Sequence, residues 1–148
     1  YGTGDSFDLQ NSHVVPAMIR KCVEAHERRQ PVLQLWGTGR ATRDFLYASD
    51  AAHAIRLAAE SLDTPDPVNV GTGVETSTAE LAYTIAEKVG YRGEIRFDAG
   101  KPDGHPRRYL DTARCKELLA FEPKVSLADG LDRTITWYLS QTSNRAAA

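Results

Sequence analysis

The sequence predicts an α/β or α+β domain, in which a small sheet packs with several helices. Segments with apolar residues three and four positions apart indicate helices, and they alternate with short segments of alternating hydrophobicity, which indicate strands. Gly-Thr-Gly occurs three times, with different neighbours each time. We therefore interpret the three copies as turns between elements and exclude a repeat architecture.

The composition is that of an ordinary globular domain. The 148 residues are enough for one hydrophobic core, and we expect a single domain over residues 1–142 with a frayed tail over residues 143–148. The net charge of −2 argues against nucleic-acid or membrane-surface partners. No apolar run approaches the roughly 18 residues of a membrane helix. The two cysteines form no Cys-x-x-Cys motif, so we expect neither zinc nor disulfides, and a cytoplasmic location.

The first helix is expected after a loop over residues 1–12. Asn11 or Ser12 would cap this helix, and Pro16 falls in its first turn, where the missing N–H costs little. Its apolar face consists of Val15, Met18, Ile19, Cys22 and Val23. Cys22 is therefore expected to be a small core residue.

Two extended segments and a second helix follow. Residues 32–35 alternate as a strand does, and residues 45–47 form a second extended piece. Ser49 or Asp50 is expected to cap a helix over residues 51–62. The predicted apolar face of that helix consists of Ala52, Ile55, Ala59 and Leu62.

The next part of the chain predicts a strand, a helix and a further strand. Residues 68–70 read as a short strand, and Ser77 with Glu80 forms a capping box for the helix. Gly90 is the expected end of that helix. Residues 94–97 alternate as a strand.

The last third of the chain predicts a loop and two helices. Residues 98–108 are rich in glycine, proline and charge, as loops are. Asp111 is expected to cap a short helix and Ser126 the last one. The apolar face of the last helix consists of Leu127, Leu131, Ile135 and Tyr138.

The segment around the second Gly-Thr-Gly turn is a candidate binding site. This segment contains a tryptophan and two arginines close together in sequence, Trp36, Arg40 and Arg43. Gly37 and Gly39, which have no side chains, lie between the tryptophan and the arginines. An indole and guanidinium groups suit a flat ring with an attached anion, because guanidinium pairs with phosphate oxygens in a bidentate way. The other interpretation is an edge tryptophan with solvated arginines.

A second cationic segment lies in the loop over residues 98–108. Lys101, Arg107 and Arg108 share that loop with Asp103, so it either binds an anion or is a solvated loop. If the fold brings this loop next to Arg43, a diphosphate becomes the natural ligand, because two negative groups need several donors.

The sequence offers one candidate for proton transfer. His13 lies at a helix N-terminus, which favours the neutral form of an imidazole, although a surface capping role is the other interpretation. Gly71-x-Gly73 lacks the third glycine of a dinucleotide loop. No nucleophile constellation supports an unrelated hydrolase.

Four motifs resemble a known family in their order and spacing. They are NSHVVPAMIRK, WGTGRATRDFLYASDAA, NVGTGVETSTAELA and FDAGKPDGHPRRYLD. They are similar to the second half of the GDP-L-fucose synthase branch of the extended short-chain dehydrogenase/reductase family of nucleotide-sugar epimerases. The resemblance runs from Tyr1 to about Leu139.

The resemblance implies a domain of the substrate-binding type and a GDP-linked sugar as its ligand. The family performs NADPH-dependent 3,5-epimerisation and 4-reduction of a GDP-4-keto-6-deoxy-mannose. By the resemblance, His13 handles epimerisation protons, Trp36 and Arg43 hold the diphosphate, and Lys101 lies on the substrate side. Lys21 stands where the family more often has Arg, which would make a phosphate contact single-point.

The family's NADP loop, catalytic Ser and Tyr-x-x-x-Lys pair have no counterpart in this sequence. The resemblance therefore implies no cofactor site in this chain and no turnover by the chain alone. The alternative is a non-catalytic interaction module derived from a truncated epimerase gene. Residues 68–70 belong, by the resemblance, to a sheet with further strands, so we also expect a homo-oligomer.

Overall fold

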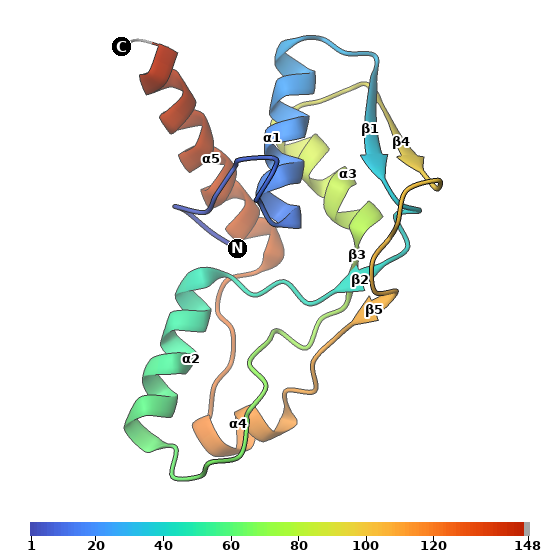
Figure 1. Cartoon of the computed structure of the whole chain (residues 1–148). Helices are drawn as coiled ribbons and strands as arrows, with labels where there is room; N and C mark the ends of the chain where they lie inside the picture. Colours follow the sequence, from blue (N-terminus) through green and yellow to red (C-terminus); the bar gives the residue numbers. More distant parts are fainter. Residues whose placement is uncertain (147–148) are drawn as a thin grey trace.

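The computed structural model describes residues 1–146 and shows an α/β fold, as the sequence predicts (Figure 1). The elements in chain order are α1 (Val14–Glu27), β1 (Val32–Trp36), β2 (Thr42–Arg43), α2 (Ala48–Ser61), β3 (Thr76–Ser77), α3 (Thr78–Val89), β4 (Glu94–Asp98), β5 (Arg107–Arg108), α4 (Ala113–Leu119) and α5 (Leu127–Ala146). The expected tail from residue 143 overlaps α5, and residues 147–148 lie outside the described residues.

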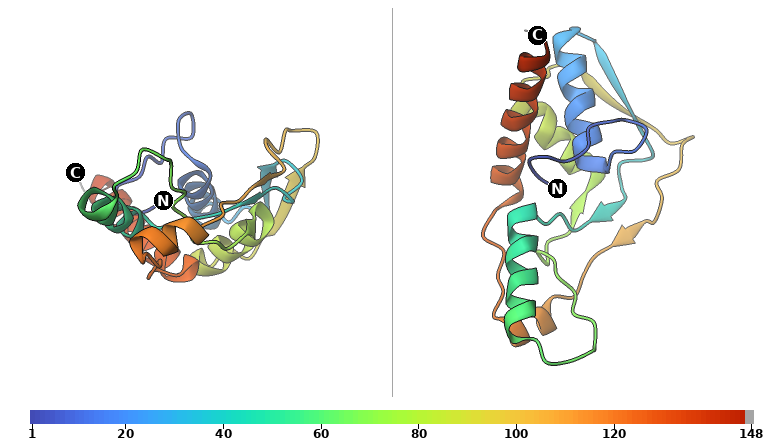
Figure 2. Two further views of the ribbon diagram at one scale, coloured as in Figure 1. Left: turned by 90° about the horizontal axis from the view of Figure 1, so that it is seen from below. Right: turned by 60° about the vertical axis from the view of Figure 1, so that its left-hand side comes forward.

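The strands form two small sheets. β1 and β4 pair in parallel, and β2 lies between β3, which is antiparallel to it, and β5, which is parallel to it. Figure 1 shows α1, α3 and α5 in one lobe with the β1–β4 sheet, and α2 with α4 in a second lobe. The β3-β2-β5 sheet lies between the two lobes, and Figure 2 shows the same separation from a second direction.

The main core lies in the first lobe, between α1, α3, α5 and β1. The predicted apolar face of α1 is confirmed, because Val15, Met18, Ile19, Cys22 and Val23 are all buried. On α5, Leu131 and Ile135 are buried, while Leu127 and Tyr138 pack against the same core. The alternation of apolar residues with period 3.6 therefore located this core correctly.

The second lobe has a smaller core, and the predicted apolar face of α2 is wrong at three of its four residues, since only Leu62 packs against that core. Ile55 is 67% exposed, and Ala52 and Ala59 are also exposed. The buried positions of α2 are Asp50 and Ala54. The Asp50 carboxylate accepts from backbone N–H groups of another segment, and Ala54, Leu57 and Ala58 of the same helix pack in the smaller core. The predicted face therefore points toward solvent.

Several predicted caps shift by one to three residues. His13, not Asn11 or Ser12, is the N-cap of α1, and Tyr47, not Ser49 or Asp50, is that of α2; neither makes a side-chain cap. The N-cap of α4 is Thr112, which makes no side-chain cap, while the carboxylate of the predicted cap, Asp111, still accepts from the N–H of Ala113 at the start of the helix. The predicted cap of α5 is confirmed, since Ser126 accepts from the N–H of Asp129.

The predicted strand over residues 68–70 is wrong. Those residues are not in a strand and have no ladder partner within the described part of the chain. Residues 45–47 likewise form no strand, while β3 and β5 occupy positions that the sequence predicts as a cap and a loop. The strand over residues 94–97 is confirmed as β4. Two-residue strands such as β3 and β5 give no periodic signal in a sequence.

The capping box at the start of α3 is confirmed. Ser77 accepts from the N–H of Glu80, the Glu80 carboxylate accepts from the N–H of Ser77, and Gly90 ends the helix in a left-handed conformation. We expect Ser77→Ala to destabilise the chain by about 1 kcal/mol, as measured by urea unfolding. Ser61→Ala is the control, because Ser61 is the last residue of a different helix, α2, and caps no N–H group among the described residues. Equal losses of stability in the two variants would contradict the capping role of Ser77.

None of the helices in the described part of the chain has the length and hydrophobicity needed to cross a bilayer.

Candidate functional site

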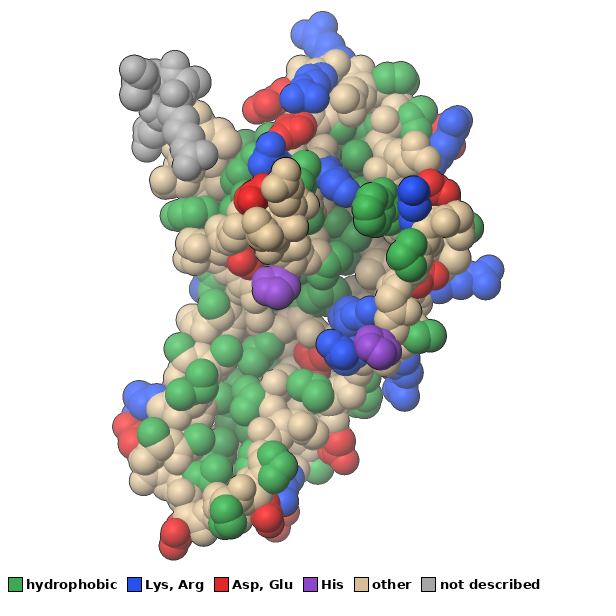
Figure 3. Space-filling view, in the orientation of Figure 1, with side chains coloured by type: hydrophobic (Ala, Val, Ile, Leu, Met, Phe, Trp, Pro, Cys, Tyr) green, Lys and Arg blue, Asp and Glu red, His purple; other side chains and the backbone are tan. Residues whose placement is uncertain are grey.

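The β3-β2-β5 sheet brings the two cationic segments of the sequence together. Arg43 of β2 and Arg108 of β5 are direct partners in the parallel register. Because directly paired residues on neighbouring strands project to the same face, both guanidinium groups lie on one side of the sheet. We call this side the arginine face. Figure 3 shows basic side chains gathered over the region of β2 and β5.

The arginine face carries positive charge without a neutralising acid. Neither Arg43 nor Arg108 forms an ion pair with any residue whose side chain the structure describes. Arg43 donates from Nη1 to the carbonyl of Thr42 at 2.6 Å, which leaves other donors of the guanidinium. Gly104 runs beside it, since a Cβ there would lie 3.6 Å from Arg43 Nη2. Two neighbouring guanidinium groups in this state are suited to an anion with several oxygens.

The neighbouring Arg107 has a different environment. Its guanidinium makes a bidentate contact with Glu75, with distances of 2.8–3.0 Å, and stacks on Tyr109 at 5.0 Å. Glu75 also accepts from Thr42 Oγ1 at 2.5 Å. The sequence offered Arg107 and Arg108 as equal candidates for anion binding. In the structure, Arg107 is paired with the carboxylate of Glu75, and Arg108 lies on the arginine face.

We expect acid to weaken the Glu75–Arg107 contact. The hydrogen bond from Arg107, followed by that from Thr42, lowers the pKa of Glu75 from 4.5 to about 2. Because the pKa is lower in the folded chain, the contact stabilises it fully above about pH 4.5 and loses this contribution as the pH falls toward about 2. Urea unfolding at pH 6, 4 and 3 should show the stability difference between wild type and Glu75→Gln shrinking with acid; a constant difference would contradict this.

Asp103 fastens the loop over residues 98–108 to the second Gly-Thr-Gly turn. Its carboxylate accepts from the N–H and from the Oγ1 of Thr38, both at 2.6 Å, and these bonds lower the pKa of Asp103. Gly37 has a φ of +85°, and a Cβ there would overlap the Asp103 carboxylate. Glycine is thus required at this position by both the backbone and the space.

The same attachment brings Trp36 and Lys101 together. Lys101 Nζ lies 5.6 Å from the centre of the Trp36 indole, which is 68% exposed. Lys101 follows a tight turn in which its N–H donates to the carbonyl of Asp98. Trp36 ends β1, Arg43 lies in β2, and Lys101 lies in the loop that Asp103 fastens; none of the three lines the cavity described below. The candidate site is therefore an open surface in this chain.

The third Gly-Thr-Gly turn does not fit a dinucleotide. The N–H groups of Thr72 and Gly73 and the Oγ1 of Thr72 all donate to the carboxylate of Asp44, at 2.6–3.1 Å. The donors that would cradle a phosphate are therefore occupied from within the chain. In the second turn, the Asp103 carboxylate likewise occupies the N–H and the Oγ1 of Thr38.

The other two sequence candidates lie on α1. His13 is exposed at the N-terminus of that helix, and Lys21 is half-buried within it. No hydrogen bond or ion pair in the described part of the chain joins either of them to Arg43 or Lys101. No group of three or more His, Cys, Asp or Glu side chains suited to a metal occurs among the described residues.

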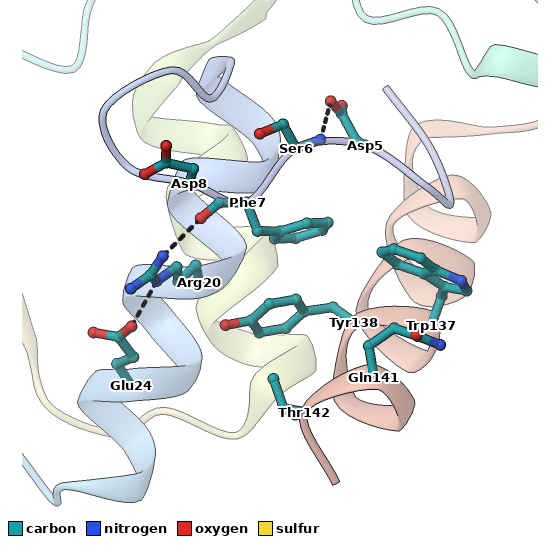
Figure 4. Close-up of a pocket in the computed structure, with 10 residues that line it drawn as sticks. All are labelled: Asp5, Ser6, Phe7, Asp8, Arg20, Glu24, Trp137, Tyr138, Gln141 and Thr142. Carbon is teal, nitrogen blue, oxygen red and sulfur yellow. Dashed lines mark hydrogen bonds and ion pairs between the residues drawn. The ribbon is translucent and has the colours of Figure 1, made fainter. Parts of the chain in front are cut away.

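The chain also has a cavity of about 550 Å³ between the first loop, α1 and α5 (Figure 4). Phe7 stacks on Tyr138 with a centroid distance of 4.3 Å and lies 5.9 Å from Trp137. Arg20 donates to the carbonyl of Phe7 and to Glu24, so the loop is tied to α1. None of the predicted site residues lines this cavity.

The sequence is similar to those of known proteins. Residues 1–71 match the model of the NAD dependent epimerase/dehydratase family. The chain is 40% identical to GDP-L-fucose synthase 1 of Arabidopsis thaliana over 145 residues, and 43% identical to GDP-L-fucose synthase of Escherichia coli K12 over 148 aligned positions. This chain is similar to part of a GDP-L-fucose synthase.

The matched segment is less than half of each relative. The alignments cover 98% and 94% of this chain, but 45% and 46% of the Arabidopsis and E. coli GDP-L-fucose synthases. The crystal structure of a GDP-L-fucose synthetase from Naegleria fowleri bound to NADP superposes with a TM-score of 0.89 at 25% identity, covering 97% of this chain and 45% of that one. The fold is therefore that of the corresponding part of these proteins.

Proposed function

We propose that this chain is the nucleotide-sugar-binding part of an epimerase/reductase that acts on a GDP-linked sugar. In this proposal Arg43 and Arg108 bind the diphosphate, while Trp36 and Lys101 flank it. The observation that carries the proposal is the direct pairing of Arg43 with Arg108, with no acidic partner for either among the described side chains. Similarity to GDP-L-fucose synthases supports a GDP-linked sugar as the ligand.

The chemistry of the arginine face suits a diphosphate. Each guanidinium can donate two parallel hydrogen bonds to phosphate oxygens, and this arrangement is stronger and more directional than a single ammonium contact. The exposed indole of Trp36 offers a flat apolar surface next to the Lys101 ammonium. Such a surface suits a sugar or base ring beside a phosphate.

The remaining sequence candidates take supporting roles in the proposal. His13, exposed at the start of α1, is the proposed proton donor and acceptor for epimerisation, in combination with a residue outside this chain. Lys21 is the proposed single-point cation for a phosphate. We propose that the chain alone does not transfer hydride, because the donors of its glycine turns are occupied by Asp44 and Asp103.

One observation favours a second function, that of an oligomeric interaction module. The smaller lobe exposes Ile55 and Leu118, and Val68 and Val70 lie beside its core without a strand partner in the described part of the chain. Exposed apolar side chains and unpaired extended segments recruit other chains. In this proposal the chain forms a homo-oligomer through the smaller lobe, and light scattering of a monomer at high concentration would contradict it.

Calorimetric titration separates the two functions. GDP and GDP-mannose should bind the full chain with similar affinity, and guanosine, which lacks the phosphates, should bind far more weakly. Equal binding of guanosine and GDP would contradict the role of the arginine face. Absence of heat with all three ligands would favour the interaction module.

A further inference from the structure

Glu75 contacts both of the other strands of the sheet, from the face opposite Arg43 and Arg108. It lies immediately before β3, accepts from Thr42 of β2, and makes the bidentate contact with Arg107 of β5. Thr42 and Arg107 are direct register partners, one position before Arg43 and Arg108. Since successive side chains on a strand project to opposite faces, the Glu75 contacts lie behind the arginine face.

The two arginines of the arginine face repel each other, and a contact between β5 and the rest of the sheet offsets this repulsion. Like charges directly opposite each other on neighbouring strands destabilise the pairing, and Arg43 with Arg108 is such a pair. β5 is an edge strand of only two residues, so few ladder hydrogen bonds hold it against β2. This repulsion weakens the pairing of β5 with β2 in the absence of an anion, and the Glu75–Arg107 contact offsets it from the opposite face.

We propose that Glu75 is a positioning residue, which acts through Arg107 to hold Arg108 beside Arg43 before the diphosphate binds. This inference rests on the proposed function, because it assigns a further residue to the same site. Glu75 does not face the ligand: its carboxylate is occupied by Arg107 and Thr42. Its effect is to arrange the two guanidinium groups in advance, which lowers the ordering cost of binding.

The first test is the affinity of the full chain for GDP after Glu75→Gln. We expect binding about tenfold weaker than in wild type, in the range of typical coupling between neighbouring sites. Glu94→Gln is the control, because Glu94 also makes a bidentate pair with an arginine, Arg96, but on the other sheet. The control should bind GDP as wild type does. Arg107→Ala removes the other member of the Glu75–Arg107 pair, so it should weaken GDP binding by a similar factor.

The decisive measurement is a double-mutant cycle with Arg108→Ala. If Glu75 acts by placing Arg108, the double variant Glu75→Gln/Arg108→Ala should bind GDP about as weakly as Arg108→Ala alone. A residue that only stabilises the fold would instead weaken binding by the same factor in both backgrounds. Additive losses would therefore overturn the inference, as would wild-type affinity in Glu75→Gln.

The same experiment separates this inference from the function on which it rests. If wild type fails to bind GDP, both are wrong. If wild type binds GDP, Arg108→Ala weakens binding, and Glu75→Gln has no effect, the diphosphate site stands and only the positioning role is wrong.

Discussion

Replacing Asp50 with alanine should destabilise the chain by about 3 kcal/mol, because two N–H groups lose their acceptor. Asp50 is 5% exposed, and its Oδ2 accepts from the N–H groups of Lys124 and Val125, both at 2.9 Å. Asp50 also lies in the first turn of α2, where a negative charge is favourable. Each N–H left without a partner costs about 1–3 kcal/mol where water cannot replace the carboxylate.

Urea unfolding of Asp50→Ala measures this loss. Asp63→Ala is the matched control, since Asp63 is exposed and lies just beyond α2. Asp50→Asn should be intermediate, because an amide oxygen can still accept both hydrogen bonds but carries no charge. A stability of Asp50→Ala equal to that of the control would show that the segment around Lys124 does not depend on this carboxylate.

Replacing Arg43 with alanine should weaken GDP binding by about 10- to 150-fold, which corresponds to the roughly 1.5–3 kcal/mol of a hydrogen bond to a charged group. Arg43 supplies half of the arginine face, and no acid among the described side chains pairs with it, so the change leaves no unpaired carboxylate. Arg43→Lys should be intermediate, because an ammonium keeps the charge and loses the bidentate geometry.

Calorimetry with GDP measures the effect, and Arg96→Ala is the control, because it removes the same charge from an exposed position of β4. Equal losses in both variants would indicate a general effect of charge and contradict a specific site. Raising the salt concentration should weaken GDP binding to wild type more than to Arg43→Ala, since fewer charged contacts remain in the variant.

The sequence predicted those parts of the fold that depend on neighbouring residues. The apolar face of α1, the capping box of Ser77 and Glu80, and the end of α3 at Gly90 all rest on spacings of three to four residues or on one glycine. These features are local, so their physical cause is visible in the sequence.

The parts that failed depend on partners far along the chain. Ala54, Leu57, Ala58 and Leu62 recur at helical spacing as the predicted residues do, so the sequence near Ile55 offers two possible apolar faces. The choice between them depends on what α2 packs against, including the N–H groups that bind Asp50, which lie 74 and 75 positions later. Residues 68–70 have the composition of a strand, but composition does not specify which strand they join.

The candidate site was predicted in the same uneven way. Sequence alone identified Trp36, Arg43 and Lys101 as residues of interest, but it could not choose between Arg107 and Arg108. That choice depends on the register of β2 with β5, and on Glu75, which reaches Arg107 across 32 positions. Once β5 is known to be a strand, two adjacent arginines must face opposite sides, so at most one of them can share a face with Arg43.

A crystal structure of the chain with GDP tests the central claim most directly. We expect the diphosphate to lie on the β2–β5 face, with its oxygens within hydrogen-bonding distance of the guanidinium groups of Arg43 and Arg108. We also expect the Glu75–Arg107 contact to remain on the opposite face. GDP bound instead in the cavity beside Phe7 and Tyr138, with the arginine face in contact with water alone, would contradict it.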